Sequence, residues 1–343
     1  MKPVFIIAEA GVNHNGNFDL ALKMVEVAKE CGADAIKFQT FQAESLVDTH
    51  AQLADYQKNN LKNKTISQYE MLKALELSKD NFIKLKKKSD QVGIYFLSTP
   101  FDEESVGFLE PLVNAFKISS GDLTHYPLLK RVSQGDKPVI LSTGMSDLEE
   151  VRRACQVFYG HKCKSDILNP LTLLHCTTNY PASFAEVNLL AMKTLNQELK
   201  LSVGYSDHTV GCEVALAAVA MGASMIEKHF TLDSSMEGPD HKASLDPLAL
   251  KQFIKIIREI ELALGDGIKK PMNSELSNRK IARRSLYYSK KIDAGSKISE
   301  KDLIVKRPAI GLNPFDWDSI VGKTLKKSVN KDALVEKEDF AED

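Results

Sequence analysis

The chain has 343 residues, a formal net charge of −1, 43% hydrophobic residues and 27% charged residues. A charge near zero with no basic stripe gives a nucleic-acid partner no electrostatic support. No apolar run approaches the roughly 18 residues that a membrane span needs, and the start MKPVFIIAEAG lacks a signal peptide's cleavage region. The five cysteines are scattered and form no CxxC pair, which favours a reducing cytoplasm over a disulfide framework or a structural zinc.

Short apolar runs alternate with longer amphipathic segments from Met1 to about Gly265. The runs are continuous rather than strictly alternating, as in parallel strands that are buried on both faces. We expect strands at Val4–Ala8, Ala35–Phe38, Ile94–Leu97, Ala115–Ile118, Pro138–Leu141, Leu171–Leu174, Leu201–Tyr205 and Ser224–Lys228. Apolar residues at helical spacing predict helices at Leu20–Cys31, Asn81–Val92, Asp147–Phe158, Gly211–Gly222 and Pro247–Leu264.

Eight strand–helix repeats of this length predict an α/β fold, a (β/α)8 (TIM) barrel over residues 1–267. An open doubly wound sheet is the alternative, but no GxGxxG follows the first run. The polar connection Phe41–Lys79 is long, with a short helix expected at Gln68–Leu77, and is typical of a lid near the barrel mouth. Residues 268–284 are predicted to form a linker, and residues 285–343 a small second domain of short strands and turns.

Polar or ionisable residues stand at the end of every predicted strand. In a barrel, catalytic groups come from these carboxyl ends. They are Glu9 after the first strand, Lys37 and Gln39 at the second, Ser98–Thr99 at the third, Lys117 with Ser120 and Asp122 at the fourth, Ser142 at the fifth, Thr178 and Tyr180 after the sixth, Ser206 and His208 at the seventh, and His229 at the eighth, with Asp240 beyond it. Eight polar strand ends out of eight favour a catalytic mouth.

Two lysines lie inside apolar runs, Lys37 in DAIKFQT and Lys117 in NAFKISSG. A buried lysine needs an anion or a covalent role, so two lysines among hydroxyl side chains indicate a pocket for a phosphate, a carboxylate or both. A single Schiff-base lysine, as in an aldolase, is a competing interpretation. The structural alternative is that each lysine points outward and pairs on the helix side of the barrel.

Two histidines, His208 and His229, each follow a predicted strand of the stretch Gly204–Lys242. Neighbouring parallel strands would bring both imidazoles to the same end of the sheet, as a divalent metal site or an acid–base pair. Manganese, cobalt or zinc suits two imidazoles better than magnesium does. His14 is a candidate for substrate contact or for capping a turn, and His241 is not expected to be a ligand.

Ten short motifs together closely resemble the bacterial sialic acid synthase family and span almost the whole chain in order. They are EAGVNHNG (Glu9–Gly16), KFQTF (Lys37–Phe41), STPFD (Ser98–Asp102), KISSGD (Lys117–Asp122), LSTGM (Leu141–Met145), LLHCTTNYP (Leu173–Pro181), GYSDHT (Gly204–Thr209), EKHFTLD (Glu227–Asp233), GPDHKAS (Gly238–Ser244) and KRPAIG (Lys306–Gly311). The resemblance implies a (β/α)8 barrel followed by an antifreeze-like SAF domain that caps the barrel of a partner in a domain-swapped homodimer.

The same resemblance implies a cytoplasmic, metal-dependent transferase that condenses phosphoenolpyruvate with an N-acetylated mannosamine-type sugar and releases phosphate by C–O cleavage. His208 and His229 are expected to hold the metal, Mn²⁺ first, with Mg²⁺ or Co²⁺ as alternatives. Phosphoenolpyruvate is expected at Lys37, Thr99, Lys117, Ser120, Ser142, Thr178 and Ser206. The sugar is expected at Glu9, Gln39, Tyr180 and Asp240, and at Arg307 from the other protomer.

The expected catalytic residues are Glu9, Lys37, Lys117 and Asp122, with Asp122 taking the proton of the attacking water. Many relatives have Glu at position 122 and some have Asn at position 178, so Asp122 and Thr178 depart from the family pattern. N-acetylneuraminate is the first expected product, with N,N'-diacetyllegionaminate, made from 2,4-diacetamido-2,4,6-trideoxymannose, as the alternative and pseudaminate third. A non-catalytic sugar- or ice-binding protein is the alternative from another class.

Overall fold

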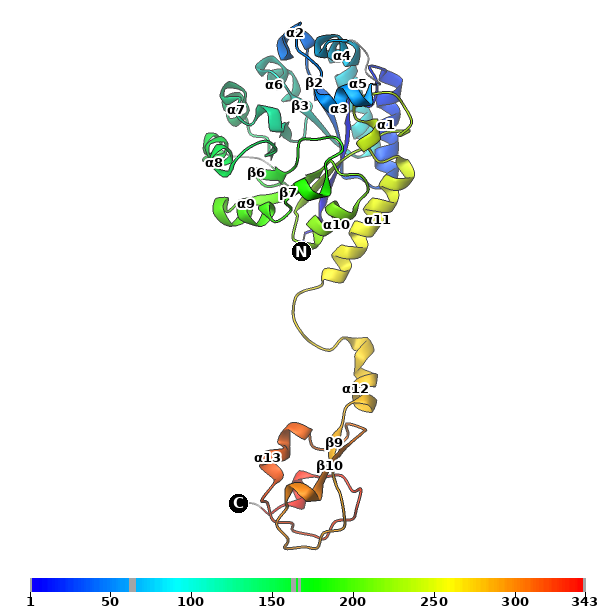
Figure 1. Cartoon of the computed structure of the whole chain (residues 1–343), viewed down its shortest axis with the longest axis vertical. Coiled ribbons are helices and arrows are strands. Elements are labelled where there is room, and N and C mark those ends of the chain that lie inside the picture. Colours follow the sequence, from blue (N-terminus) through cyan, green and yellow to red (C-terminus); the bar gives the residue numbers. More distant parts are fainter. Residues whose placement is uncertain (1, 62–65, 162–164, 166–167, 342–343) are drawn as a thin grey trace. The chain divides into compact units, whose positions relative to one another are not determined.

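The computed structural model describes residues 2–61, 66–161, 165 and 168–341. The chain divides into two compact units, Met1–Asp266 and Gly267–Asp343, which are drawn in Figure 1. Each unit has its own hydrophobic core, so each is described by itself.

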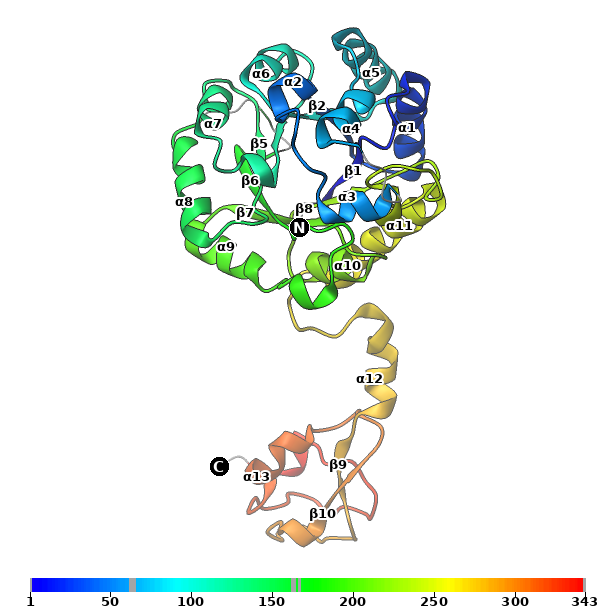
Figure 2. The same ribbon diagram turned by 45° about the horizontal axis from the view of Figure 1, so that its top comes forward.

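The first unit is a closed barrel of eight parallel strands in sequence order, which confirms the predicted (β/α)8 fold. Closure comes from β1, which pairs with both β2 and β8. The helices surround the barrel, as Figure 2 shows. The strands are β1 (Phe5–Gly11), β2 (Ala35–Thr40), β3 (Tyr95–Pro100), β4 (Phe116–Ile118), β5 (Val139–Ser142), β6 (Leu171–His175), β7 (Ser202–Asp207) and β8 (Met225–His229).

The outer helices begin and end where side chains and glycines dictate. Asn17 caps the first helix two residues earlier than predicted, because its side chain accepts hydrogen bonds from Asp19 and Leu20. The helix expected at Gly211–Gly222 covers only Glu213–Ala220, because both glycines have positive φ values of 83° and 99°. The outer helices are α1 (Phe18–Cys31), α5 (Lys79–Val92), α6 (Glu103–Leu109), α7 (Tyr126–Ser133), α8 (Leu148–Val157), α9 (Ala191–Leu199), α10 (Glu213–Ala220) and α11 (Pro247–Leu264).

The inward-facing residues of the strands change character along the barrel axis. One layer is apolar and plugs the barrel; it contains Ile7, Ala35, Leu97, Ala115, Ile140, Leu174 and Met225. Because side chains alternate between the two faces of a strand, the next inward residues are two positions later: Glu9, Lys37, Thr99, Lys117, Ser142 and Glu227. All strands except β4 end one to three residues later than predicted, and polar residues lie within the strand ends.

A lid segment between β2 and α5 covers part of the mouth (Figure 2). It contains α2 (Ala43–Leu46), α3 (Asp55–Asn60) and α4 (Gln68–Leu75). Ser67 and Glu70 form a capping box that starts α4, and the helix ends two residues before the predicted Leu77, since Glu76 is extended. Met71 and Leu75 of α4 pack in a small core with Val12 and Phe41 from the ends of β1 and β2.

The second unit is built on a short antiparallel pair, β9 (Ser285–Tyr288) and β10 (Leu303–Lys306). Its core includes Leu286, Tyr288 and Val335, and the Tyr288 hydroxyl donates to Asp339 at 3.0 Å. The unit also contains α13 (Trp317–Ile320) and, within the predicted linker, α12 (Leu276–Ala282). Residues 265–284 are all exposed.

Two further observations concern membrane-spanning helices and the cysteines. No helix in the part of the chain that the structure describes is long and apolar enough to cross a membrane. The four described cysteines are free thiols, Cys31, Cys155, Cys176 and Cys212. Cys163 lies outside the described residues.

Candidate active site

A cavity of about 350 Å³ opens at the carboxyl ends of the barrel strands. Its lining comes from all eight strands or the loops that follow them, and from the lid. Most of the residues singled out from the sequence meet here: Glu9, Lys37, Gln39, Thr99, Lys117, Ser120, Ser142, Thr178, Tyr180, Ser206, His208, His229 and Asp240. Both lysines thus face inward, against the alternative that they pair on the helix side.

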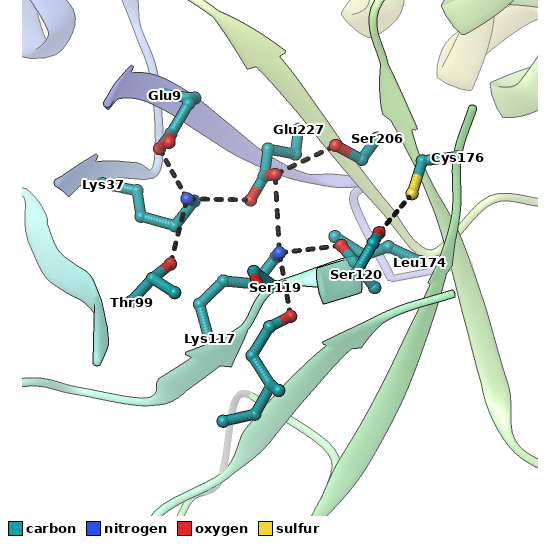
Figure 3. A network of polar contacts seen from close by, with 12 residues as sticks. Glu9, Lys37, Thr99, Lys117, Ser119, Ser120, Leu174, Cys176, Ser206 and Glu227 are labelled. Carbon is teal, nitrogen blue, oxygen red and sulfur yellow. Dashed lines mark hydrogen bonds and ion pairs between the residues drawn. The ribbon is translucent and has the colours of Figure 1, made fainter. Parts of the chain in front are cut away.

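Four buried ionisable side chains, Glu9, Lys37, Lys117 and Glu227, form what we call the charged floor of the cavity. Lys37 Nζ lies 2.7 Å from Glu9 Oε2 and 3.8 Å from Glu227 Oε2. Lys117 Nζ lies 3.7 Å from Glu227 Oε1. Figure 3 draws these contacts as dashed lines. The strand register accounts for the cluster, because Glu9 is aligned with Lys37 on one side and with His229 on the other.

Burial and the two lysines shift the pKa values of the two glutamates in the floor in opposite directions. Burial raises the pKa of Glu9 to about 7, although Lys37 opposes the rise. Burial would also raise the pKa of Glu227, but Lys117 and Lys37 outweigh burial and lower it. Burial, together with Lys37, lowers the pKa of Lys117. Glu227 is therefore the permanent anion of the floor, and Glu9 is the carboxyl that can exchange a proton near neutral pH.

Hydroxyl groups surround the lysines. Lys117 Nζ donates to Ser142 Oγ at 2.7 Å, and Lys37 Nζ donates to Thr99 Oγ1 at 3.3 Å. Ser206 Oγ donates to Glu227 Oε1 at 2.9 Å. Two cations with convergent hydroxyls are suited to a ligand that carries phosphate or carboxylate groups.

A tight pocket of small groups extends this anion site beside Gly144. Ser120 Oγ accepts from the Gly144 amide at 3.0 Å and contacts Cys176 Sγ at 3.1 Å. A Cβ at position 144 would lie 2.4 Å from Thr178 Oγ1 and 2.9 Å from Ser120 Oγ, so only glycine fits. Thr178 Oγ1 is buried and has no hydrogen-bond partner among the described residues, which leaves it available to a ligand atom.

His208 and His229 lie side by side, with ring centroids 5.5 Å apart. His208 Nδ1 is 2.7 Å from the Thr177 carbonyl, which only accepts, so Nδ1 carries the proton and Nε2 keeps its lone pair. Burial lowers the pKa of His208 to about 4 and holds the pKa of His229 well below its usual range, so both rings are neutral. The neutral imidazole is the form that binds metals, and the Thr177 carbonyl fixes the orientation of the His208 ring.

These two imidazoles fit a divalent cation as two of its ligands. His229 Nδ1 is buried without a hydrogen-bond partner among the described residues, and Asp240 Oδ2 is 3.9 Å from it. No group of three or more His, Cys, Asp or Glu side chains within the described ranges is arranged to hold a metal. Substrate and water oxygens would therefore have to complete the coordination shell.

Three further candidates line the same cavity. Gln39 Nε2 donates to Glu9 Oε1 at 3.2 Å. The Tyr180 ring lies 4.2 Å from the His208 ring, centroid to centroid. Burial raises the pKa of Asp240 to about 6. Amide, phenol and carboxyl groups converging on one cavity provide the hydrogen bonds that a sugar needs.

The lid and the loops after β1 and β3 supply the apolar part of the lining. We call this part the lid wall; it consists of Val12, Met71, Leu72, Leu75 and Phe101. Asn60 Nδ2 donates to the Pro239 carbonyl at 2.6 Å, which ties α3 to the loop that carries Asp240. The cavity therefore has a charged floor and an apolar wall.

Two expected site residues are not in the cavity lining. Asp122 accepts a hydrogen bond from Ser119 Oγ at 2.5 Å and lies behind it, whereas Ser119, Ser120 and Gly121 line the cavity. The short 3-10 turn Ser120–Asp122 accounts for this, since it turns residue 122 away from residue 120. Arg307 belongs to the second unit and is exposed.

The other histidines of the motifs serve the scaffold. His14 Nδ1 accepts from the Gly16 amide at 3.1 Å and caps the loop after β1. His241 is buried, with its ring nitrogens 2.7 Å from Thr231 Oγ1 and 3.2 Å from Asn15 Oδ1. His241 is thus a structural residue, as expected from its place beyond GPD.

Sequence reasoning gave no role to Glu227, which the structure places between the two lysines. The signal was present: Glu227 and His229 are two residues apart on one strand and therefore share a face. Ser119 was likewise passed over in favour of Ser120 and Asp122. Both omissions concern residues whose direction depends on the register of a strand or turn.

Comparison with known proteins agrees with this geometry. A model of the NeuB family matches residues 24–269 and a model of the SAF domain matches residues 283–341. The chain is 49% identical to the N,N'-diacetyllegionaminic acid synthase of Legionella pneumophila (95% of this chain, 91% of the relative) and 48% identical to that of Campylobacter jejuni (98% and 99%). The crystal structure of the N-acetylneuraminic acid (sialic acid) synthetase from Leptospira borgpetersenii superposes with a TM-score of 0.71 at 35% identity, covering 81% of this chain and 90% of that one. The chain belongs to the NeuB family and carries a C-terminal SAF domain.

Proposed function

We propose that this protein is a synthase that joins phosphoenolpyruvate to the open-chain form of an N-acetylated mannosamine-type sugar, giving a nonulosonic acid and inorganic phosphate. One observation carries the proposal: two buried lysines with their hydroxyl partners share a cavity with two neutral imidazoles. A phosphorylated carboxylic acid matches the lysine side of the cavity. An aldehyde held by a cation matches the imidazole side.

The proposed residue roles follow from these contacts. Lys37, Lys117 and Ser142 bind the phosphate and carboxylate of phosphoenolpyruvate, and Thr178 and Ser120 complete that site. A divalent cation bound by His208 and His229 supplies Lewis-acid polarisation of the aldehyde when present. Gln39, Tyr180 and Asp240 hold the hydroxyl and acetamido groups of the sugar.

The proposed chemistry forms one C–C bond and replaces the C2–O bond to phosphate by a C2–O bond to an oxygen from water. C3 of phosphoenolpyruvate attacks C1 of the sugar, and the C1 oxygen takes up a proton, for which Glu9, with a pKa near 7, is the donor. Water then adds to C2 and gives up one proton. As the C2 hydroxyl becomes the ketone, phosphate leaves with the C2–O electron pair and takes up the hydroxyl proton. We retain Asp122 as the acceptor of the water's proton, through Ser119, whose hydroxyl it already binds and which lines the cavity.

Two observations favour 2,4-diacetamido-2,4,6-trideoxymannose over N-acetylmannosamine as the acceptor, the second of the two sugars named from the sequence. The relatives at 49% and 48% identity are legionaminic acid synthases. The lid wall also offers Met71, Leu72 and Leu75 to the end of the sugar away from the charged floor. A methyl group at C6 suits such a wall better than a hydroxymethyl group, which would lose hydrogen bonds to water there.

The test is a phosphate-release assay with phosphoenolpyruvate, Mn²⁺ and each sugar in turn. We expect release with both and a higher kcat/KM with the trideoxy sugar. EDTA should abolish release, and Mn²⁺, Co²⁺ and Mg²⁺ should each be tested for its restoration. Absence of phosphate release with every acylated mannosamine would refute the proposed function, and borohydride trapping of pyruvate on a lysine would favour an aldolase.

Arg307 is proposed to reach the sugar's acetamido group from the SAF domain of a second copy in a domain-swapped homodimer. Arg307 is exposed, and the apolar Ile310 and Phe315 near it in sequence are 64% and 98% exposed. The proposal predicts complementation: Arg307→Ala and Lys117→Met each lose most of the activity alone, and a mixture of the two regains activity. No recovery after subunit exchange would contradict it.

A further inference from the structure

A buried ion pair that the proposed chemistry does not use lies directly beside the two histidines. Lys228 Nζ is 2.8 Å from Asp207 Oδ2, and the two side chains are 1% and 0% exposed. Asp207 precedes His208, and Lys228 precedes His229. Neither member of the pair lines the cavity, so the pair is not a binding site for substrate.

The pair faces away from the cavity because side chains alternate along a strand. On β8, Glu227 and His229 point into the barrel and Lys228 points to its outer side. On β7, Ser206 lines the cavity and Asp207 faces the other way. Asp207 and Lys228 are aligned partners in the β7–β8 register, so the ion pair ties the two histidine-bearing strand ends together from behind.

The pair also holds the loop that continues from His208. Lys228 Nζ donates to the Thr209 carbonyl at 2.6 Å. Asp207 Oδ1 accepts from the Thr209 amide at 3.0 Å and from its hydroxyl at 2.8 Å. His208 therefore sits between two residues, Asp207 and Thr209, whose positions are fixed by the same buried lysine.

Stability alone gives little reason for such a pair. Removing two charges from water costs about as much as their attraction returns, and apolar replacements of buried ion pairs are often neutral or stabilising. What a buried pair with several hydrogen bonds does provide is one defined geometry. Two imidazoles can bind one cation only if both strand ends keep their relative position.

We propose that Lys228 and Asp207 are positioning residues that fix His208 and His229 at the spacing a divalent cation requires. The pair acts through the backbone of the two strand ends and touches neither cation nor substrate. This inference rests on the proposed cation site. It adds to that site an outer layer of residues that the cavity itself does not reveal.

The test measures Mn²⁺ affinity directly, by calorimetry on the full-length protein without substrates. We expect Lys228→Met to weaken Mn²⁺ binding about 10- to 100-fold, the range typical of lost outer partners of metal ligands. Asp207→Asn, which keeps the size of the side chain, should weaken binding less but in the same direction. The double variant should bind Mn²⁺ no more tightly than Lys228→Met does, because two neutral side chains do not restore the ion pair between the strand ends.

A control at a partly exposed ion pair elsewhere in the barrel separates positioning from general loss of stability. Arg258 Nη2 pairs with Asp34 Oδ2 at 2.9 Å, and Asp34 accepts from the Ile6 amide at the amino-terminal end of the barrel. Arg258→Met should lower the melting temperature and leave the Kd for Mn²⁺ unchanged. The inference is overturned if folded Lys228→Met or Asp207→Asn binds Mn²⁺ within twofold of the wild type, or if Arg258→Met weakens binding equally. If the wild-type protein binds no Mn²⁺, the proposed cation site itself fails.

Discussion

The charged floor and the lid wall enclose the same cavity but are built in opposite ways. The floor comes from barrel strands, and its side chains are held by ion pairs and hydrogen bonds from three or more strands. The wall comes largely from the lid segment between β2 and α5 and consists of apolar side chains in a small core of their own. The floor is thus tied directly to the strands of the barrel, whereas most of the wall belongs to a segment inserted between β2 and α5.

The strongest test of this contrast removes one cation from the floor. Lys117→Met should lower kcat/KM for phosphoenolpyruvate on the order of 10³-fold, because a buried charge aimed at the reacting anion is lost. Steady-state phosphate release measures the effect, with the exposed Lys87→Met as the control that should keep full activity. Activity within tenfold of the wild type would show that the floor is not the anion site.

A change in the wall should alter the choice of sugar and leave the anion untouched. Leu72→Gln places an amide against the far end of the acceptor, and we expect it to shift the kcat/KM ratio toward N-acetylmannosamine by about 10-fold, since one group in an apolar pocket discriminates only modestly. The KM for phosphoenolpyruvate should stay constant. Leu53→Ala serves as the control, because Leu53 packs in the lid core without lining the cavity. An unchanged kcat/KM ratio would show that the lid wall does not determine which sugar the protein prefers.

Within the floor, Glu227 competes with the incoming anion for both lysines. Glu227→Gln should therefore tighten binding of phosphoenolpyruvate by about tenfold, which corresponds to ~1.4 kcal/mol, as measured by calorimetry without sugar. The effect should shrink at high salt less than that of a surface charge, because the group is buried. Weaker binding in this variant would mean that Glu227 organises the lysines more than it opposes the anion.

The loop after β1 connects the charged floor with the lid wall. His14 in this loop makes the stability of the protein depend on pH. Burial lowers the pKa of His14 to about 4 from an ordinary 6.5, so the unfolded chain binds the extra proton between these values and stability falls as pH drops through them. His14→Asn, which can still accept from Gly16, should remove about 3 kcal/mol of this loss between pH 7 and pH 4. Denaturant unfolding at both pH values is the measurement.

The sequence predicted the barrel and most of the cavity because their signals are local. Lys37 and Lys117 stood out since apolar neighbours flank them, and eight apolar runs gave the strand count. The boundaries of β1 and β7 were set too short, because Glu9 and Asp207 look like loop residues although they pair within the sheet. Which residue of Glu227–Lys228–His229 faces inward depends on register, and apolar spacing does not contain that information.

Asp122 shows a second limit. Its place in KISSGD gave it a role in the cavity, but one turn of 3-10 helix and the hydrogen bond from Ser119 set its direction. The lid was foreseen as a long polar connection with one helix. The sequence did not predict its apolar wall, because the pattern of Met71, Leu72 and Leu75 is equally typical of the buried face of any short helix.

Gly16 has a consequence for how this enzyme could be rebuilt. It has a φ of 71°, and a Cβ on it would lie 2.3 Å from the Ala74 carbonyl of α4. Helix α4 of the lid therefore packs directly against the main chain at Gly16. The lid and the loop after β1 are therefore fitted to each other as one exchangeable module. A chimera that takes a relative's lid must carry a glycine at this position, or the transplanted helix will be displaced from its seat.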